Sequence, residues 1–179
     1  MKTEEWDFGG KTMRFVIWIL IAFIPSAVGF PAEIKNGDGS KTCIPEQSLD
    51  FSDWKSWTRI NPKPHLSVGH SNVWVEIYVN KLAKDIYRNA RAPYPPCAKI
   101  VKVSYKDRET KQFIDLTAMF KMPAGYDSEN HDWWYATFDQ VGVHAEEKGR
   151  LANCITCHKK AARTDFLFSK EVMKATKGP

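Results

Sequence analysis

The sequence predicts a β-dominated α+β fold, an antiparallel sheet with a few helices, one of them near the C-terminus. Three observations support this prediction. Residues 73–79 (VWVEIYV) are β-branched and aromatic, and residues 98–105 alternate between two faces. Two further strand-like runs follow, separated by a loop rich in Pro, Gly, Asp and Asn. The order strand, helix, then three strands indicates antiparallel pairing rather than repeated βαβ units.

The first half of the domain holds one strand and one helix. Residues 30–69 contain few regular patterns, so we expect an irregular arm with a short helix near Leu49–Trp57. The strand over residues 73–79 is followed by Asn80, which can cap a helix running through about Ala90. Three prolines then end that helix.

The second half holds three strands in succession. Residues 98–105 form the second strand, and Asp107–Thr110 reads as a turn. Phe113–Met122 forms the third strand and Trp133–Phe138 the fourth. We find no internal repeat, so residues 70–179 are expected to fold as one domain.

Composition narrows the function classes. The 179 residues are 43% hydrophobic and 26% charged, which suits a globular protein and not a disordered or multi-span one. The net charge of +5 is spread along the chain, so we expect no nucleic-acid partner. The acidic pairs Asp50/Asp53 and Glu146/Glu147 are typical of solvated faces rather than catalytic dyads.

The N-terminus predicts export. Phe15–Ile24 is an unbroken apolar run that follows basic residues and is too short to span a bilayer. Ala27 and Gly29 have the spacing of a signal-peptidase site, which predicts cleavage before Phe30 and a signal peptide over residues 1–29. The alternative is a buried N-terminal helix or an uncleaved anchor. We expect a periplasmic or otherwise exported protein without a membrane span after cleavage.

One motif carries specific chemistry. Of the four cysteines, Cys43 and Cys97 are isolated, whereas Cys154 and Cys157 belong to the sequence CITCH that ends at His158. Two thiols at this spacing can each form a thioether with one haem vinyl group, and the following histidine is then held under the iron. The motif predicts one covalently bound haem c, with Cys154 and Cys157 as anchors and His158 as the proximal iron ligand.

Other uses of the motif fit less well. A thioredoxin-like Cys-x-x-Cys requires a βαβ pattern, which is not visible here, and a zinc site requires a second ligand pair at short spacing. Small cytochromes with His/Met ligation usually carry the motif near the start, with the methionine much later. Here only Met173 follows the motif, fifteen residues on. The body of the chain also does not resemble the four amphipathic helices of cytochromes c′.

In this order the motifs resemble the cytochrome P460/cytochrome c′-β family, from about His70 to Ser169. The resemblance rests on VEIYVN at 75–80, IVK at 100–102, DWWY at 132–135, CITCH at 154–158 and TDFLFS at 164–169. It implies an exported single-haem protein built on an antiparallel sheet, with the haem-binding helix near the C-terminus. It also implies a dimer, or a pairing with a related small cytochrome.

The family contains two functional types. P460 enzymes oxidise hydroxylamine and carry a strand lysine cross-linked to the porphyrin, a position that Lys102 resembles; the alternative is a snorkelling strand lysine. The c′-β proteins lack this link and bind nitric oxide. The enzymes place a distal carboxylate where this chain has Thr117, and a hydroxyl is a poor base at neutral pH. Asp115, on the same face, would supply the carboxylate if the register were shifted.

Cys97 is a second departure from both types. It could form a disulfide with Cys43, ligate the iron as a distal thiolate, or be a free or intermolecular thiol. The other candidates for a sixth ligand, each more typical of a surface residue, are His65, His70, His131 and His144.

Three functions follow from these observations. The first is a haem protein for electron transfer or nitric oxide binding. The second is a hydroxylamine-oxidising enzyme with a Lys102 cross-link, and the third is a low-potential electron carrier with His/Cys ligation. Because Thr117 stands where the enzymes have their carboxylate base, we rank the non-enzymatic functions together above the enzyme. The expected partners are nitric oxide, hydroxylamine or a redox protein.

Overall fold

The computed structural model describes residues 49–67 and 70–176. The predicted signal peptide, most of the expected arm and Cys43 lie outside these residues. None of the helices in the described ranges is long and apolar enough to cross a membrane.

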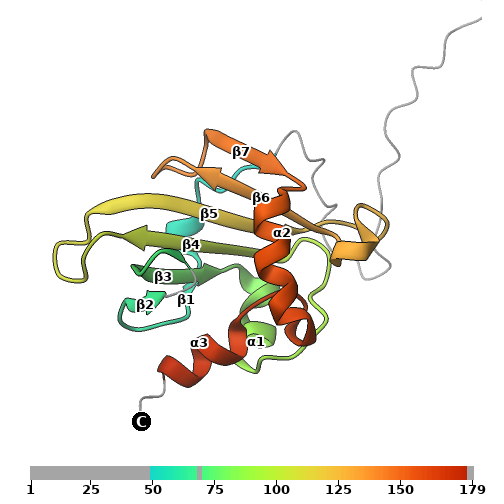
Figure 1. Cartoon of the computed structure of the whole chain (residues 1–179), viewed down its shortest axis with the longest axis horizontal. Coiled ribbons are helices and arrows are strands. Elements are labelled where there is room, and N and C mark those ends of the chain that lie inside the picture. The colour runs from blue at the N-terminus through green and yellow to red at the C-terminus, as the bar shows by residue number, and fades with distance from the viewer. Residues whose placement is uncertain (1–48, 68–69, 177–179) are drawn as a thin grey trace, which may run out of the picture. The chain divides into compact units, whose positions relative to one another are not determined.

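A single antiparallel sheet forms the centre of the fold (Figure 1). Within the described residues it has seven strands, in the order β1-β3-β4-β5-β6-β7, with β2 also paired to β3. Their bounds are β1 Thr58–Arg59, β2 His65–Ser67, β3 Val73–Val79, β4 Lys99–Tyr105, β5 Phe113–Lys121, β6 Trp133–Phe138 and β7 Ala145–Gly149. The predicted β-dominated α+β class is therefore confirmed.

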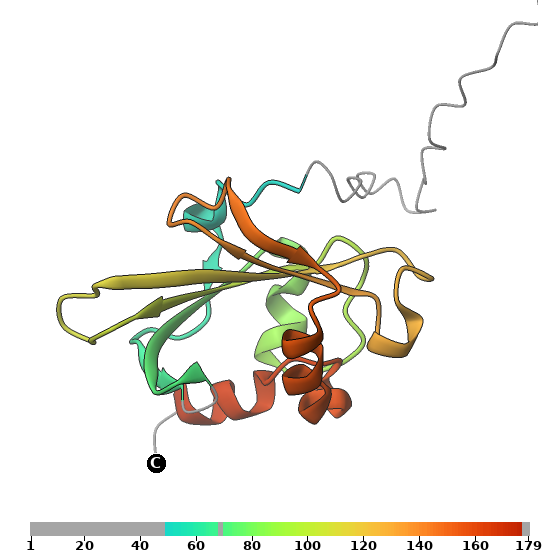
Figure 2. The ribbon, with the colours of Figure 1, turned by 45° about the horizontal axis from the view of Figure 1, so that its top comes forward.

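Three α-helices lie on one side of the sheet, below it in Figure 2. Helix α1 (Lys81–Arg88) is capped by Asn80, whose side-chain oxygen accepts a hydrogen bond from the Ala83 amide at 3.1 Å. Helix α2 (Ala152–His158) contains the whole CITCH motif and continues into the 3-10 helix η5 (Lys159–Thr164). Helix α3 (Ser169–Thr176) closes the fold.

The elements with strong local patterns match the prediction, and the weakly patterned ones were missed. Strands β3 to β6 and helix α1 lie within two residues of their expected bounds. Strands β1 and β2 fall in the segment expected to be an irregular arm, and β7 (AEEKG) was not predicted because its residues are polar and largely exposed. The short helix expected near Leu49–Trp57 is a 3-10 turn, η2 (Trp54–Ser56).

Side-chain alternation along the strands separates two hydrophobic clusters. The pocket face of the sheet includes Ile77, Ile100 and Met119, which belong to one cluster with residues of α1 and α3. The aromatic face includes Val103 and Trp134, which belong to the other cluster. Since successive strand residues point to opposite faces, strands β3 to β6 each contribute to both clusters.

The residues before β1 cover the aromatic face. Phe51 is fully buried and stacks on Trp134, and its amide donates to the carbonyl of Gly142 at 3.2 Å. Gly142 has a φ of +84°, and a Cβ there would lie 2.9 Å from the Phe51 carbonyl oxygen. The loop before β7 can therefore approach Phe51 this closely only with glycine at this position.

Candidate haem site

A pocket of about 590 Å³ opens between the pocket face of the sheet and helices α2 and α3. The predicted haem-binding residues Cys154, Cys157 and His158 all line it, and both thiols are unpaired. Its sheet wall is mainly aliphatic, with Val75, Ile77, Ile100 and Met119 among the residues that line it. Such a cavity suits a large, flat, mostly apolar group.

His158 is held in a defined orientation and tautomer. Its Nδ1 lies 2.6 Å from the carbonyl oxygen of Phe166, and because a carbonyl can only accept, Nδ1 carries the proton. The ring packs between Tyr135 and Phe168, with both ring centroids at 5.6 Å. Burial lowers the pKa of the imidazole, so it is neutral at neutral pH. The Nε2 lone pair is therefore available to a metal.

Lys102 lines the same pocket from strand β4. Its Cα is paired with that of Thr117 across β4 and β5, whereas Asp115 is paired with Ser104. Burial lowers the pKa of the Lys102 ammonium to about 8, and the charge of Asp115 opposes this shift. Thr117 lines the pocket, whereas Asp115, two residues away on the same face of β5, does not line it but lies close enough for its charge to act on Lys102 and His70.

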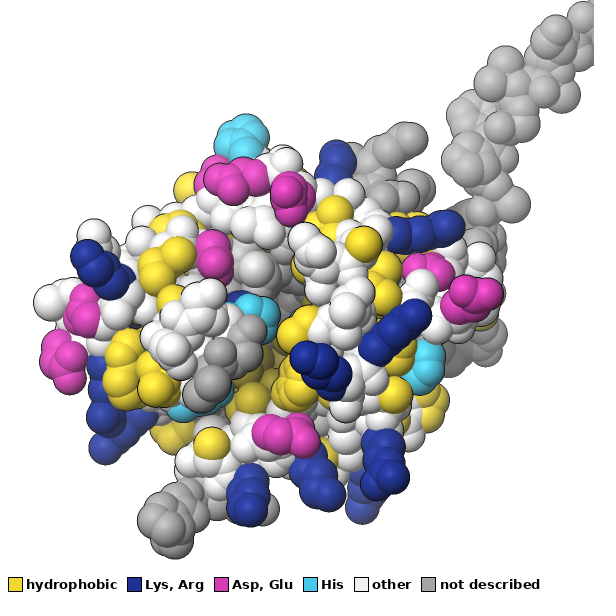
Figure 3. All heavy atoms as spheres, in the orientation of Figure 1, with side chains coloured by type: hydrophobic (Ala, Val, Ile, Leu, Met, Phe, Trp, Pro, Cys, Tyr) yellow, Lys and Arg dark blue, Asp and Glu magenta, His cyan; other side chains and the backbone are white. Residues whose placement is uncertain are grey.

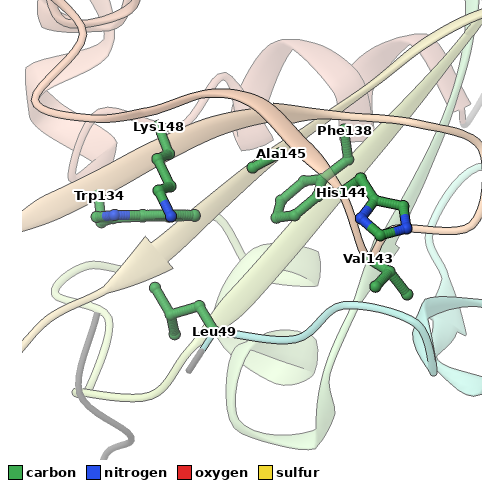
Figure 4. Close-up of a pocket in the computed structure, with 7 residues that line it drawn as sticks. All are labelled: Leu49, Trp134, Phe138, Val143, His144, Ala145 and Lys148. Carbon is green, nitrogen blue, oxygen red and sulfur yellow. The ribbon is translucent and has the colours of Figure 1, made fainter. Parts of the chain in front are cut away.

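The structure separates the four histidines considered as sixth ligands. His65 and His70 line the pocket, and burial together with the charge of Lys102 lowers the pKa of His70 to about 4. His131 lies elsewhere, where its Nδ1 donates to Asp165 at 2.8 Å. His144 lines a different, smaller pocket of about 230 Å³ beside Trp134 and Phe138, on the aromatic face (Figure 4).

Cys97 is not brought to the pocket. It is disulfide-bonded, and it packs against the hydrophobic cluster of the aromatic face. Among the residues that the structure describes, those lining the pocket do not include it. A sulfur bound in a disulfide is not available as a thiolate, so the distal Cys97 ligand and the His/Cys electron carrier that depends on it are not supported by this geometry.

The helical elements that follow the motif, η5 and α3, present a basic surface. Exposed Lys and Arg side chains gather over this part of the molecule in Figure 3. Those on η5 and α3 are Lys159, Lys160, Arg163, Lys170 and Lys174. Glu171 is the exposed acidic residue in the same stretch.

The comparison with known families decides between these interpretations of the motif. Residues 50–169 match the family described as cytochrome P460. The chain belongs to the cytochrome P460 family. No curated protein matches the chain closely enough to add a more specific relative.

Membership of the cytochrome P460 family implies a haem cofactor, and the residues present fit one. Two unpaired thiols and a neutral imidazole line one pocket, and the hydrogen bond at His158 Nδ1 leaves Nε2 free. Sequence reasoning missed the partner of that imidazole, since a backbone carbonyl supplied by a turn leaves no mark in the side-chain pattern. The TDFLFS segment of the resemblance was the one signal that pointed toward it.

Proposed function

We propose that this protein is a c-type cytochrome that binds a small nitrogen oxide, with nitric oxide as its ligand, at one covalently held haem. Cys154 and Cys157 would anchor the haem through thioethers, and His158 would be its axial ligand. The single observation that carries the proposal is that one pocket is lined by both thiols, the neutral imidazole and an aliphatic sheet wall. Export, predicted from residues 1–29, belongs to the same proposal.

The haem supplies an iron that takes up one electron and binds a diatomic molecule. The chain's own residues set the conditions for that chemistry. Ile77, Ile100 and Met119 give the pocket an apolar sheet wall, which would favour a weakly polar ligand over water. The exposed basic residues of η5 and α3 favour an acidic protein as the electron partner.

The polar side chains of the sheet wall favour binding over turnover, and the carboxylate that lines the pocket, Glu171, belongs to the exposed side of helix α3. Oxidation of hydroxylamine removes protons, which requires a base close to the substrate. The side chain opposite Lys102 is the Thr117 hydroxyl, which is not a base at neutral pH. His70 is neutral at that pH, but the charge of Lys102 and burial both oppose its protonation.

Hydroxylamine oxidation is the second candidate, and the position of Lys102 is the observation that favours it. Lys102 lines the pocket with both thiols, and a pKa of about 8 gives a fraction of neutral, nucleophilic amine at neutral pH. Joining this nitrogen to a porphyrin carbon removes two hydrogens and two electrons. The link therefore needs an external oxidant, such as a peroxide that is reduced to water.

Spectra of the haem-loaded protein test both candidates. We expect an ordinary c-type ferrous spectrum after dithionite reduction and rapid binding of nitric oxide and carbon monoxide. A strongly red-shifted, broadened ferrous Soret band that is lost in Lys102→Met would instead identify the cross-linked enzyme. A six-coordinate, low-spin iron that excludes both gases would contradict the binding function, and His65→Ala and His70→Ala variants would then identify the closing ligand.

A further inference from the structure

The carbonyl that holds His158 belongs to an unusual turn. Between η5 and α3, Asp165 and Phe166 both adopt left-handed backbone angles, with φ of 53° and 66°. The second of these residues supplies the carbonyl oxygen that accepts from His158 Nδ1 at 2.6 Å. Left-handed angles are uncommon at residues other than glycine, so such a turn persists only where its surroundings fix it.

The side chain of Asp165 fixes this turn. Its carboxylate is 3% exposed, and it accepts hydrogen bonds from the Lys121 ammonium at 2.7 and 2.9 Å. It also accepts from the Tyr94 amide and from His131 Nδ1, both at 2.8 Å. The backbone carbonyl of Asp165 accepts from Trp133 Nε1 at 2.8 Å. The turn is therefore tied to strands β5 and β6, to the loop between them, and to the loop before β4.

The same partners fix Phe166 as well. The His131 ring stacks on the Phe166 ring with centroids at 4.4 Å. The Lys121 ammonium also donates to the carbonyl of His131 at 2.7 Å, which holds that histidine in place. The buried pair Lys121 and Asp165 and the partly exposed His131 thus form one connected group, and it ends at the carbonyl that faces the predicted iron ligand.

We propose that Asp165 is a positioning residue for the axial ligand, acting through the Phe166 carbonyl. By fixing the turn it keeps the hydrogen bond to His158 Nδ1 short. A strong acceptor at Nδ1 makes the imidazole more basic at Nε2, which strengthens its bond to iron and favours the ferric state. This inference rests on the proposed function, because it requires His158 to ligate the haem iron.

The test compares Asp165→Asn, Asp165→Ala and Lys121→Met with the wild type, all in the haem-loaded protein. We expect the iron–histidine stretching band of the ferrous protein to shift to lower frequency and the reduction potential to rise. Both changes should be larger in Asp165→Ala than in Asp165→Asn, since asparagine keeps one acceptor oxygen. We also expect nitric oxide to displace His158 about tenfold faster, the smaller effect typical of losing an outer partner of a ligating histidine.

Glu76→Gln is the matched control. Glu76 is equally buried and equally engaged in ion pairs, but it lies on the aromatic face. We expect this variant to lose stability while its stretching band, potential and displacement rate stay at the wild-type values.

The possible results distinguish a failure of the role proposed for Asp165 from a failure of the proposed function. If the Asp165 variants carry haem and lose stability but keep the wild-type band and potential, Asp165 has only a structural role and the inference is overturned. If Asp165→Ala does not accumulate, the same readouts on Lys121→Met and Asp165→Asn decide. If the wild type itself shows no haem on a denaturing gel, or no iron–histidine band, the proposed function fails first.

Discussion

Each face of the sheet has a buried, ion-paired carboxylate among the described residues, yet the two carboxylates have different roles. Glu76, on the aromatic face, accepts from Arg59, Lys111, Tyr78 and Tyr105 at 2.6–3.1 Å. Asp165, on the pocket face, accepts from Lys121, His131 and the Tyr94 amide. Burial alone would raise the pKa of both, and the surrounding donors lower both instead. Their energetics are similar, but only Asp165 is connected to a candidate ligand.

The two carboxylates differ in the elements that their hydrogen-bond partners hold in place. The partners of Glu76 come from strands β1, β3 and β4 and from Lys111, so its network holds strands to one another. The partners of Asp165 hold a turn whose next carbonyl faces His158. A buried ion pair therefore indicates a functional role only when the element it fixes also contacts the site.

Replacing both Cys154 and Cys157 with serine should produce the largest difference between the pocket face and the aromatic face. Without thiols no thioether can form, so we expect complete loss of covalently bound haem, while the sheet and its aromatic face remain. Haem staining of a denaturing gel measures the first, and circular dichroism the second. Glu76→Gln should keep its haem stain, and haem that persists in the double variant would contradict the assigned anchors.

Glu76→Ala should cause the next largest change, and it should be one of stability alone. The variant leaves two tyrosine hydroxyls and two cations without their shared acceptor, although Arg59 and Lys111 can reach water. We expect the free energy of unfolding to fall by about 2–3 kcal/mol in urea titrations. A loss below about 0.5 kcal/mol would show that water replaces the carboxylate at little cost.

Replacing either of the two lysines of strand β4 should change the stability by a smaller amount, and the two changes should have opposite signs. Lys99 faces the aromatic side, where it donates to the Asp50 carbonyl at 2.8 Å and lies 4.8 Å from the Phe51 ring. Lys102 lies in the pocket, and no described residue forms a hydrogen bond or a ring contact with its ammonium group. In the haem-free serine double variant, we expect Lys102→Met to stabilise the fold and Lys99→Met to destabilise it, each by about 1 kcal/mol.

The pH dependence of the free energy of unfolding tests the direction of the effect expected for Lys102. Its pKa of about 8 lies below the ordinary value of 10.5, so between these values the unfolded chain binds the extra proton. Stability should therefore rise with pH over that window, and Lys102→Met should lose its share of the rise. Urea midpoints measured from pH 7 to pH 10.5 give this slope, and an unchanged slope in the variant would contradict the buried position.

The smallest expected effect is the acid response of the two carboxylates. Both pKa values are lowered in the folded chain, so each stabilises the fold above its unfolded value and loses that contribution as the pH falls below about 4. Glu76→Gln should flatten the acid limb of stability without changing the haem spectrum. Asp165→Asn should flatten the same limb and change the spectrum, as measured by parallel acid titrations.

What the sequence predicts well is local. The CITCH motif names three pocket residues within five positions, and strands β3 to β6 follow from runs of β-branched and aromatic residues. The Asp165 network could not be predicted, because its partners Tyr94 and Lys121 lie 71 and 44 residues away. The polar edge strand β7 was missed since its residues resemble a loop.

The contact between Phe51 and Gly142 has a consequence for the order of assembly. It joins a residue that precedes the strands of the described chain to the loop that leads into β7. Loop-closure entropy makes so distant a contact form late, so Trp134 and Phe138 stay uncovered until β6 and β7 have paired. Helix α2 begins shortly after β7, so we expect its two thiols to reach their final positions together with that pairing. We therefore expect the pairing of β6 with β7 to accompany both the covering of the aromatic face and the completion of the pocket.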